Sequence, residues 1–349
     1  MIQGNKSAAR RRGASVSAAF AKGLLDLAVE KGADAKSLLQ RSGIAAEALD
    51  DPDSRIPFAR YIALMRAGKA LATDPALAMH YGEVNIARIS VIGLIGQASE
   101  TMLEAFTQLN RYVKLVVDVD IGEGDRFQMR NERGGLWMVD TRQDANDFPE
   151  LTESAFTQLV CGPRALGVKQ IVTAVDFTHP QRSYLTEYER IFRVPIRFGA
   201  EWNAMRIDPA LMMQPIAALP RYVFGVLTAR GDALLAELEK AKTTRGRVER
   251  LLMPGLHKGD ANIDSVAAAM GTTRQTLYRH LKAEGTTFER VLDDLRHRLA
   301  LDYLQGRRVS VNQTAYLVGF SDPAAFSRAF KRWTGVNPRA ARRHATQKD

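Results

Sequence analysis

The sequence has a single cysteine, Cys161, among 349 residues, and only six histidines. One thiol excludes a disulfide framework within the chain, and such a low cysteine content fits a reducing cytoplasm. A lone cysteine is more often a buried structural side chain than a redox switch, so we expect a structural role. The histidines show neither an H-x-x-x-H pair nor a Cys/His spacing, and we therefore expect no metal site.

Long apolar runs are also missing. No segment is apolar for the roughly 18 residues that a membrane span requires. The N-terminus lacks an apolar core with a cleavage site, and no apolar segment follows the arginines at 10–12. We expect a soluble cytoplasmic protein without a membrane partner, nucleoid-associated when it is bound to DNA, with a disordered basic tail at residues 1–16.

Catalytic signatures are absent as well. The chain has no G-x-S-x-G elbow, no Walker-type phosphate loop and no G-x-G-x-x-G after a strand. Acidic pairs such as Glu100/Glu104 and Asp118/Asp120 are more typical of solvated surface than of acid–base chemistry. We expect neither an enzyme nor a bound cofactor.

The positive charge is concentrated in two segments. The net charge is +10, of which residues 258–349 carry +7 and residues 1–22 carry +5, whereas residues 23–257 carry −2. A basic segment beside a near-neutral body suits a polyanionic partner such as double-stranded DNA.

A helix-turn-helix pattern lies at residues 264–282. Small side chains at 267–269 allow a second helix to approach closely, and Gly271 can adopt the positive φ of a tight turn. Thr272 or Thr273 can cap the next helix. In that helix Leu277 and Leu281 face inward, and the opposite face is polar, with Gln275, Tyr278, Arg279 and Lys282.

A second unit follows the same plan. Ser310 and Gln313 form a predicted capping box for a short helix that ends at Gly319. Asp322 as the N-cap and Pro323 at the first helical position begin another helix. The inner face of that helix is anchored by Phe326 and Phe330, and its outer face carries Ser327, Arg328 and Lys331.

A helix long enough to separate the two units joins them. Residues 288–304 have apolar side chains at helical spacing and no internal glycine or proline. A helix of this length spans about 25 Å. With the flanking turns, the recognition helices would approach the ~34 Å spacing of one DNA turn, so one monomer could read two successive major grooves.

Residues 258–343 resemble the DNA-binding domain of the AraC/XylS family, through the motifs AYLVGFSD at 315–322, FSRAFKR at 326–332 and TGVNP at 334–338. The resemblance implies RNA polymerase as a partner and activation as the outcome. It implies base contacts by Gln275, Tyr278, Arg279, Ala324, Ala325, Ser327 and Arg328, and backbone contacts by Thr273, Arg274, Lys282, Lys331, Arg332 and Arg339. Ala324 and Ala325 have no side-chain donors, which favours thymine-methyl contact and phosphate anchoring by the second helix.

The remaining chain predicts an α+β protein, with a mixed sensor domain before an all-α domain of two helix-turn-helix units joined by a long helix. Helices are expected at 17–30, 58–71, 101–117, 150–161 and 221–242, and strands at 124–130, 136–141, 171–178 and 204–208. The expected domains are an effector-sensing domain at 17–235, a linker at 236–257 and the DNA-binding domain at 258–345.

The N-terminal region is similar to the arabinose-binding-like domain of a subgroup of AraC regulators, through Tyr81-Gly82, IGLIG at 92–96 and VPIRFG at 194–199. The resemblance implies an effector of unknown identity, from the class of amino acids and organic acids. Candidate pocket residues are Tyr112, Trp137, Arg142, His179 and Arg197. Each has a structural alternative: aromatic core, salt bridge or hydrogen-bonded histidine.

The sequence leaves three questions open. The regulator could respond to a protein partner instead of a metabolite, or bind DNA as an effector-independent architectural protein. A homodimer could form through the helices at 101–117 or 150–161, although either helix could instead bury its apolar face in its own domain. We expect a one-component switch in which the effector shifts the balance between free and restrained DNA-binding domains.

Overall fold

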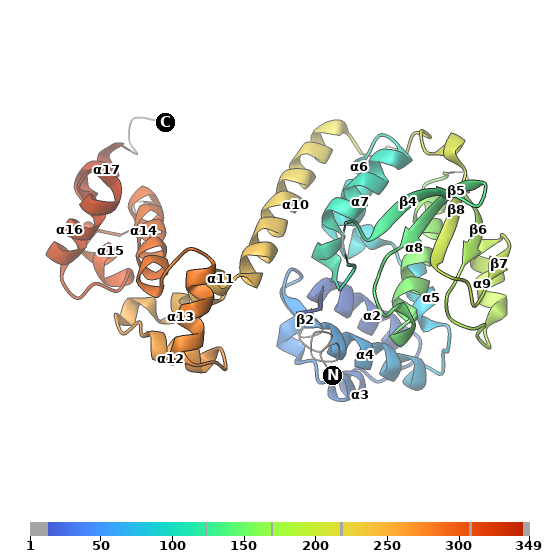
Figure 1. The fold of residues 1–349 in the computed structure, drawn as a ribbon, viewed down its shortest axis with the longest axis horizontal. Helices are drawn as coiled ribbons and strands as arrows, with labels where there is room; N and C mark the ends of the chain where they lie inside the picture. Colours follow the sequence, from blue (N-terminus) through green and yellow to red (C-terminus); the bar gives the residue numbers. More distant parts are fainter. Residues whose placement is uncertain (1–12, 123, 169, 217–218, 307–308, 345–349) are drawn as a thin grey trace. The chain divides into compact units, whose positions relative to one another are not determined.

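The computed structural model describes residues 13–344, apart from 123, 169, 217–218 and 307–308. It divides into two compact units, residues 1–236 and 237–349 (Figure 1). Most of the predicted tail lies outside the described residues, but its end does not match the prediction, because Val16 is fully buried in a strand. Among the described helices, none is long and apolar enough to cross a membrane.

The first unit begins with a small antiparallel sheet of order β2-β1-β3, formed by Ser15–Ser17 (β1), Arg55–Pro57 (β2) and Val117–Asp118 (β3). Arg55 holds this sheet together, since its guanidinium donates to the carbonyl oxygens of Leu115 at 2.6 Å and Ser15 at 2.9 Å. The surrounding helices are α2 (Ala18–Glu30), α3 (Ala35–Ser42), α4 (Phe58–Leu71), α5 (Leu77–Glu83), α6 (Val91–Ala98) and α7 (Met102–Val116).

A second, five-stranded sheet has the order β4-β5-β8-β6-β7, and all its pairs are antiparallel except β6 with β7. Its strands are β4 (Phe127–Glu132), β5 (Gly135–Asp140), β6 (Val172–Asp176), β7 (Ile196–Arg197) and β8 (Asn203–Ile207). The four predicted strands are confirmed as β4, β5, β6 and β8. The paired Met138 and Met205 belong to a core that also contains Phe156 of α8 (Glu150–Ala165), whereas Trp137 belongs to a separate, small cluster.

Two apolar cores meet along α5 and α8. Leu77 of α5 and Leu151 of α8 belong to the first core, and Met79 and Phe156 of the same helices belong to the second. The two helices pack closely at Gly82, where an added Cβ would lie 2.6 Å from the carbonyl oxygen of Ser154. The close approach requires glycine there. The other helix of this region is α9 (Leu185–Phe192).

The predicted connecting helix is confirmed with the same bounds as α10 (Arg221–Lys242), which lies beside α7 (Figure 1). Tyr112 of α7 is fully buried, and its hydroxyl donates to Asp232 of α10 at 2.7 Å. Gly231 packs against the ring of the same tyrosine. Thus α10 is attached to α7 before the chain enters the second unit.

The second unit is helical, and α14 (Phe288–Gly306) is its axis. Figure 1 shows α12 (Ile263–Ala269) and α13 (Arg274–Ala283) at one end of α14. At the other end lie α15 (Val311–Leu317), α16 (Pro323–Thr334) and α17 (Pro338–His344). Each end has its own apolar core, the first around Leu277 and Leu295 and the second around Phe326 and Phe330.

The region predicted as a linker, 236–257, is largely part of this second unit. It contains α11 (Thr244–Leu252) and the 3₁₀ helix η5 (Met253–Lys258). Val248, Leu252 and Leu256 are buried in the same core as Leu277. The linker prediction was wrong because α11 is stabilised by burial against residues far along the chain. Local composition does not reveal such contacts.

Glu249 in α11 is a buried carboxylate with three cationic partners. Its side chain is 3% exposed and lies 2.8 Å from Lys240, 3.0 Å from Arg245 and 2.9 Å from Arg298. Burial by itself would raise the pKa of this carboxyl, but the hydrogen bonds from these three side chains lower the pKa to about 2. The charged form therefore stabilises the junction of α10, α11 and α14.

Glu249→Gln should destabilise the second unit by about 1–3 kcal/mol at neutral pH, because the amide cannot replace a charge-assisted hydrogen-bond acceptor. The folded pKa of about 2 lies below the unfolded value of about 4.3, so the stabilisation is complete above that unfolded value and is lost as pH falls toward 2. Urea unfolding of the full chain, followed by hydrogen exchange in α11 and α14, measures the difference at several pH values.

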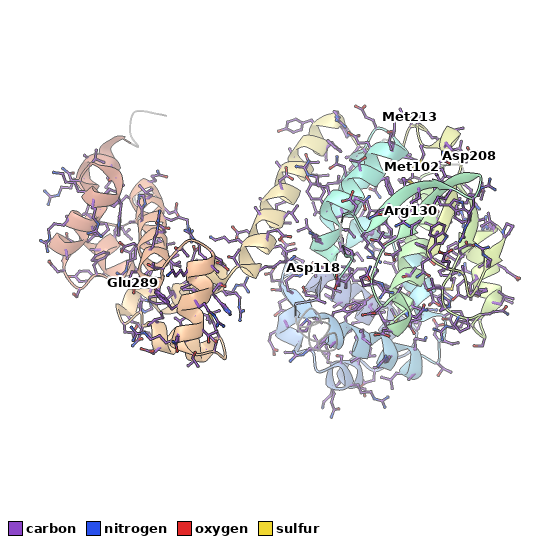
Figure 2. The ribbon with its side chains drawn as sticks, in the orientation of Figure 1. Met102, Asp118, Arg130, Asp208, Met213 and Glu289 are labelled. Carbon is purple, nitrogen blue, oxygen red and sulfur yellow. The ribbon has the colours of Figure 1, made fainter. Side chains whose placement is uncertain are left out.

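Glu289→Gln is the matched control, since this acid lies exposed on α14 (Figure 2). We expect it to change stability by less than about 0.5 kcal/mol at any of these pH values. If the effect of Glu249→Gln did not diminish between pH 4 and pH 2, the proposed ionic contribution would be wrong.

Candidate nucleic-acid interface and effector cavity

The first helix-turn-helix unit has the predicted turn and cap. Gly271 has a φ of 64°, and the side chain of Thr273 accepts from the backbone N–H of Thr276 at 3.2 Å. Leu277 and Leu281 are buried against α14 and α11. The choice between two capping threonines is therefore settled in favour of Thr273, and the inward face of α13 is confirmed.

The outward face of α13 is open to solvent. The predicted contact residues Gln275, Tyr278, Arg279 and Lys282 are all exposed. Arg279 forms no ion pair with any residue that the structure describes, so its guanidinium is available to a ligand. Arg274 differs, because it lies 3.4 Å from Asp264 of α12. Both of those side chains are more than half exposed, and such a pair adds little stability.

The second unit begins with the capping box between Ser310 and Gln313, which is confirmed. The next helix, α16, is capped by Asp322, whose carboxylate accepts from the backbone N–H groups of Ala324 and Ala325 at 2.9 Å each. These backbone hydrogen bonds lower the pKa of the Asp322 carboxyl. Pro323 occupies the first helical position, as predicted.

The outward face of α16 offers few polar groups. Ser327 is half-buried, and its hydroxyl donates to the carbonyl oxygen of Pro323 at 2.9 Å. Ala324 is exposed, Ala325 is half-buried, and Arg328 is 74% exposed at 3.9 Å from Asp322. The first turns of α16 therefore present methyl groups and one guanidinium, which differs from the polar face of α13.

The predicted backbone contacts occupy exposed positions around these helices. Lys331 is exposed at the C-terminal half of α16, and Arg339 is exposed on α17. Arg332 is exposed but lies 3.2 Å from Asp293 of α14. The α14 axis has 19 residues and is about 28 Å long at ~1.5 Å per residue, so it separates the two recognition helices.

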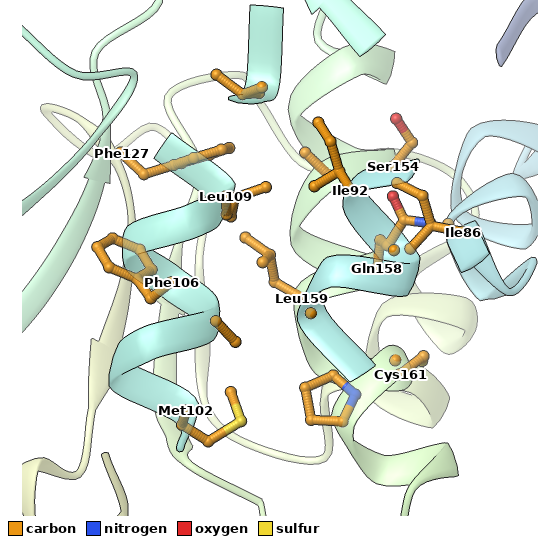
Figure 3. A pocket seen from close by; sticks show the side chains of 18 of the residues that line it. Ile86, Ile92, Met102, Phe106, Leu109, Phe127, Ser154, Gln158, Leu159 and Cys161 are labelled. Carbon is orange, nitrogen blue, oxygen red and sulfur yellow. The ribbon is translucent and has the colours of Figure 1, made fainter. Parts of the chain in front are cut away.

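The first unit contains a cavity of about 290 Å³ between α6, α7, α8 and the five-stranded sheet. In Figure 3, Met102 and Leu109 of α7 lie on one side, and Gln158, Leu159 and Cys161 of α8 lie on the other. Cys161, which we expected to be buried, is half-buried at this wall. The apolar lining includes Phe20, Ile86, Ile92, Phe106, Val113, Phe127, Met129, Met138, Met205, Ile207, Met212 and Ile216.

None of the five predicted effector residues lines this cavity. The Tyr112 hydroxyl faces α10, as described above, and Trp137 packs in the small cluster with Val139 and Ala204. Arg197 is 57% exposed and pairs with Asp176. The structure thus gives these three residues intramolecular contacts away from the cavity.

Arg142 and His179 are buried elsewhere in the same unit. Arg142 donates to the carbonyl oxygens of Ala145 at 2.8 Å and Phe148 at 2.9 Å. His179 places Nδ1 2.9 Å from the carbonyl oxygen of Pro180, and burial lowers its pKa. Both side chains therefore make hydrogen bonds to backbone carbonyl oxygens within the protein.

Sequence reasoning missed the cavity residues for a physical reason. Their side chains occupy the inward faces of helices and strands, where apolar periodicity indicates core whether or not space remains between the elements. Arg126 was missed as well, and the signal in its sequence context is weak: a charged residue next to Phe127, the first residue of β4. Arg126 is only 2% exposed and lines the cavity.

Comparison with known proteins gives matches for both units. The family model described as the arabinose-binding domain of AraC transcription regulator, N-term, matches residues 32–216, and one described as a helix-turn-helix domain matches residues 266–344. The chain is 28% identical over 332 residues to the ornithine utilization regulator of Pseudomonas aeruginosa, covering 93% of this chain and 95% of that protein. It is 23% identical over 327 residues to the HTH-type transcriptional regulator VirS of Mycobacterium tuberculosis, covering 92% and 94%. A shorter match of 86 residues is 40% identical to the urease operon transcriptional activator of Escherichia coli and covers 25% of this chain and 29% of that protein.

Proposed function

Because the chain belongs to the AraC family of transcription regulators, its role is regulatory and not enzymatic, and we propose that each monomer reads two successive major grooves of double-stranded DNA. The observation that carries this proposal is the pair of capped helices, α13 and α16, at opposite ends of α14. An axis of about 28 Å with turns at its ends supports a spacing near the ~34 Å repeat of the duplex.

The two helices have different tasks in this proposal. Gln275, Tyr278 and Arg279 read base edges through the polar face of α13, since Arg and Gln match the major-groove faces of guanine and adenine. In α16, Ala324 and Ala325 contact thymine methyl groups, and Arg328 and Ser327 complete the base contacts. The phosphate contacts are made by Thr273, Arg274, Lys282, Lys331, Arg332 and Arg339.

A small molecule in the cavity controls this binding. The cavity wall includes Met102, Phe106 and Leu109 of α7, and the same helix holds α10 through the Tyr112–Asp232 hydrogen bond. A ligand that binds one position of α7 more tightly than another shifts the equilibrium between arrangements of α10. Since the chain enters the second unit through α10, this coupling gives the effector a route to the DNA-binding domain.

The regulator activates transcription in this proposal, through contact with RNA polymerase. Two relatives with shorter matches, of 86 and 92 residues, are named as activators: the urease operon transcriptional activator of Escherichia coli and the transcriptional activator NphR of Rhodococcus. Reading two successive grooves requires only one monomer.

Binding to the DNA upstream of the gene and its neighbours tests the proposal. We expect a footprint over two adjacent major grooves that persists in excess random duplex at two salt concentrations. Binding that random DNA removes equally would instead support an architectural protein. A footprint that responds to a protein and to no small molecule would support control by a protein partner.

A further inference from the structure

We propose that the cavity binds a hydrophobic carboxylic acid of medium chain length, with its alkyl part among the methionines and its carboxylate at Arg126. This inference rests on the proposed function, since it names the chemical class of the effector. It differs from an effector of the ornithine type, which would bring two ammonium groups into the cavity besides its carboxylate.

The cavity wall is suited to an alkyl chain. Five methionines line it, at positions 102, 129, 138, 205 and 212, together with phenylalanine, leucine, isoleucine and valine side chains. Methionine is flexible and polarisable, so it adapts to chains of irregular shape. A sugar or a diamino acid would lose its hydrogen bonds to water against this wall, which costs binding free energy.

The polar side chains of the wall are mostly engaged within the protein. Gln158 donates to the carbonyl oxygen of Val84 at 3.2 Å, and Ser154 donates to that of Leu151 at 3.1 Å. The carboxylate of Glu83 accepts hydrogen bonds from both Nη atoms of Arg190, in a bidentate pair. These groups therefore offer few hydrogen bonds to a polyhydroxylated ligand.

Arg126 is different because it is the one cationic side chain among the described residues that line the cavity. It shares Asp140 with Arg142: its Nε and Nη2 each lie 3.2 Å from that carboxylate, and the Arg142 backbone N–H donates to it at 3.2 Å. All three residues are at least nine-tenths buried. Asp140 therefore engages two nitrogens of the Arg126 guanidinium, whereas the Arg142 guanidinium donates to carbonyl oxygens and to Thr152.

The guanidinium also has a free side. Among the described residues, Nη1 of Arg126 has no hydrogen-bond partner, and the guanidinium carbon lies 4.8 Å from the ring centroid of Phe127, which faces the cavity. A ligand carboxylate at this position would accept charge-assisted hydrogen bonds from Nη1. The same apolar surroundings would strengthen that interaction.

The volume sets the length of the ligand. At roughly 30 Å³ for each water-sized group, a cavity of about 290 Å³ holds roughly ten non-hydrogen atoms. Octanoate has that size, so it is the probe of choice. Shorter acids would leave part of the cavity empty.

Titration calorimetry of the full chain with octanoate, 1-octanol, acetate and L-ornithine tests the proposal. We expect octanoate to bind about tenfold or more tightly than 1-octanol, because only the carboxylate accepts charge-assisted hydrogen bonds from Arg126. Acetate and ornithine should not bind detectably. Equal binding of octanoate and octanol, a preference for ornithine, or no binding of octanoate would each overturn it.

Three variants locate the site. Arg126→Met should reduce octanoate binding to the level of octanol and leave octanol binding unchanged, whereas Arg206→Met, on an exposed arginine of β8, should alter neither. Leu109→Trp, which fills the cavity, should abolish both. If Arg126→Met fails to fold, the comparison of the two ligands on the natural chain still decides the outcome.

DNA footprinting in the same samples separates this inference from the proposed function. Octanoate binding without any change in promoter occupancy would keep the ligand class and reject effector control through this cavity. Ornithine-dependent promoter occupancy without octanoate binding would keep effector control and reject the ligand class.

Discussion

Gly319→Ala should lower the stability of the second helix-turn-helix unit by about 3 kcal/mol or more. The residue follows α15 with a φ of 82°, a conformation that alanine adopts only with strain. An added Cβ would also overlap the carbonyl oxygen of Leu256 in η5, and backbone atoms there cannot move aside cheaply. The substitution therefore combines backbone strain with overpacking.

Gly319 lies where the two ends of the second unit touch. Its own carbonyl oxygen accepts from Nη2 of Arg296 in α14 at 3.1 Å, so the position is held from two sides. A shift here would move α15 and α16 relative to η5 and α11. We therefore expect Gly319→Ala to weaken specific DNA binding as well as stability.

Gly335→Ala is the matched control, because it follows α16 with a φ of 78° but has no atom within 4 Å of an added Cβ. It should cost only the backbone strain, about 1 kcal/mol. Hydrogen exchange in α15 and α16 of the full chain measures both variants. Equal losses for the two glycines would show that the contact with Leu256 is unimportant.

The helices and caps that were predicted correctly depend on residues that are close together in the sequence. The 58–71 and 221–242 helices were predicted with the bounds that α4 and α10 have. The caps Ser310 and Asp322 were also predicted, and Thr273 was one of the two threonines proposed as the cap of α13. Periodicity and capping depend on neighbours in the chain, so sequence alone reveals them.

The boundary between the units could not be predicted in this way. Glu249 and the basic residues around it are typical of an exposed linker, yet that carboxylate is buried by Lys240, Arg245 and Arg298. Its burial depends on a partner about fifty residues away. Only the tertiary structure brings these charges together.

The cavity was missed for a related reason. Candidate pocket residues were chosen by chemistry, as aromatic, arginine and histidine side chains, and the structure assigns these to packing and salt bridges. A cavity is space that helices and strands leave unfilled, and apolar residues such as Leu109 and Met205 look the same in sequence whether they face one another or a ligand. Arg126 became a candidate only once its position at the cavity wall was known.

Arg279→Ala should weaken binding to the specific site by about 1–3 kcal/mol and abolish the preference for one base pair. The reason is geometric: a guanidinium can donate two hydrogen bonds to guanine O6 and N7, and no other base offers that pair of acceptors. Arg279 is exposed on α13 and forms no ion pair with a described residue, so its loss should leave the fold intact. Competition binding against every base at the contacted position measures the effect.

Lys331→Ala provides the contrast, since this exposed side chain on α16 is proposed to contact phosphate. It should weaken specific and random duplex by the same factor and reduce the slope of log affinity against log salt by about one. Arg66→Ala removes a similar charge from an exposed position on α4 and should change neither quantity. Base preference belongs to a side chain that contacts base edges, whereas salt dependence belongs to any cation at the backbone. Equal losses on specific and random DNA for Arg279→Ala would therefore remove Arg279 from the base-reading set and place it among the phosphate contacts.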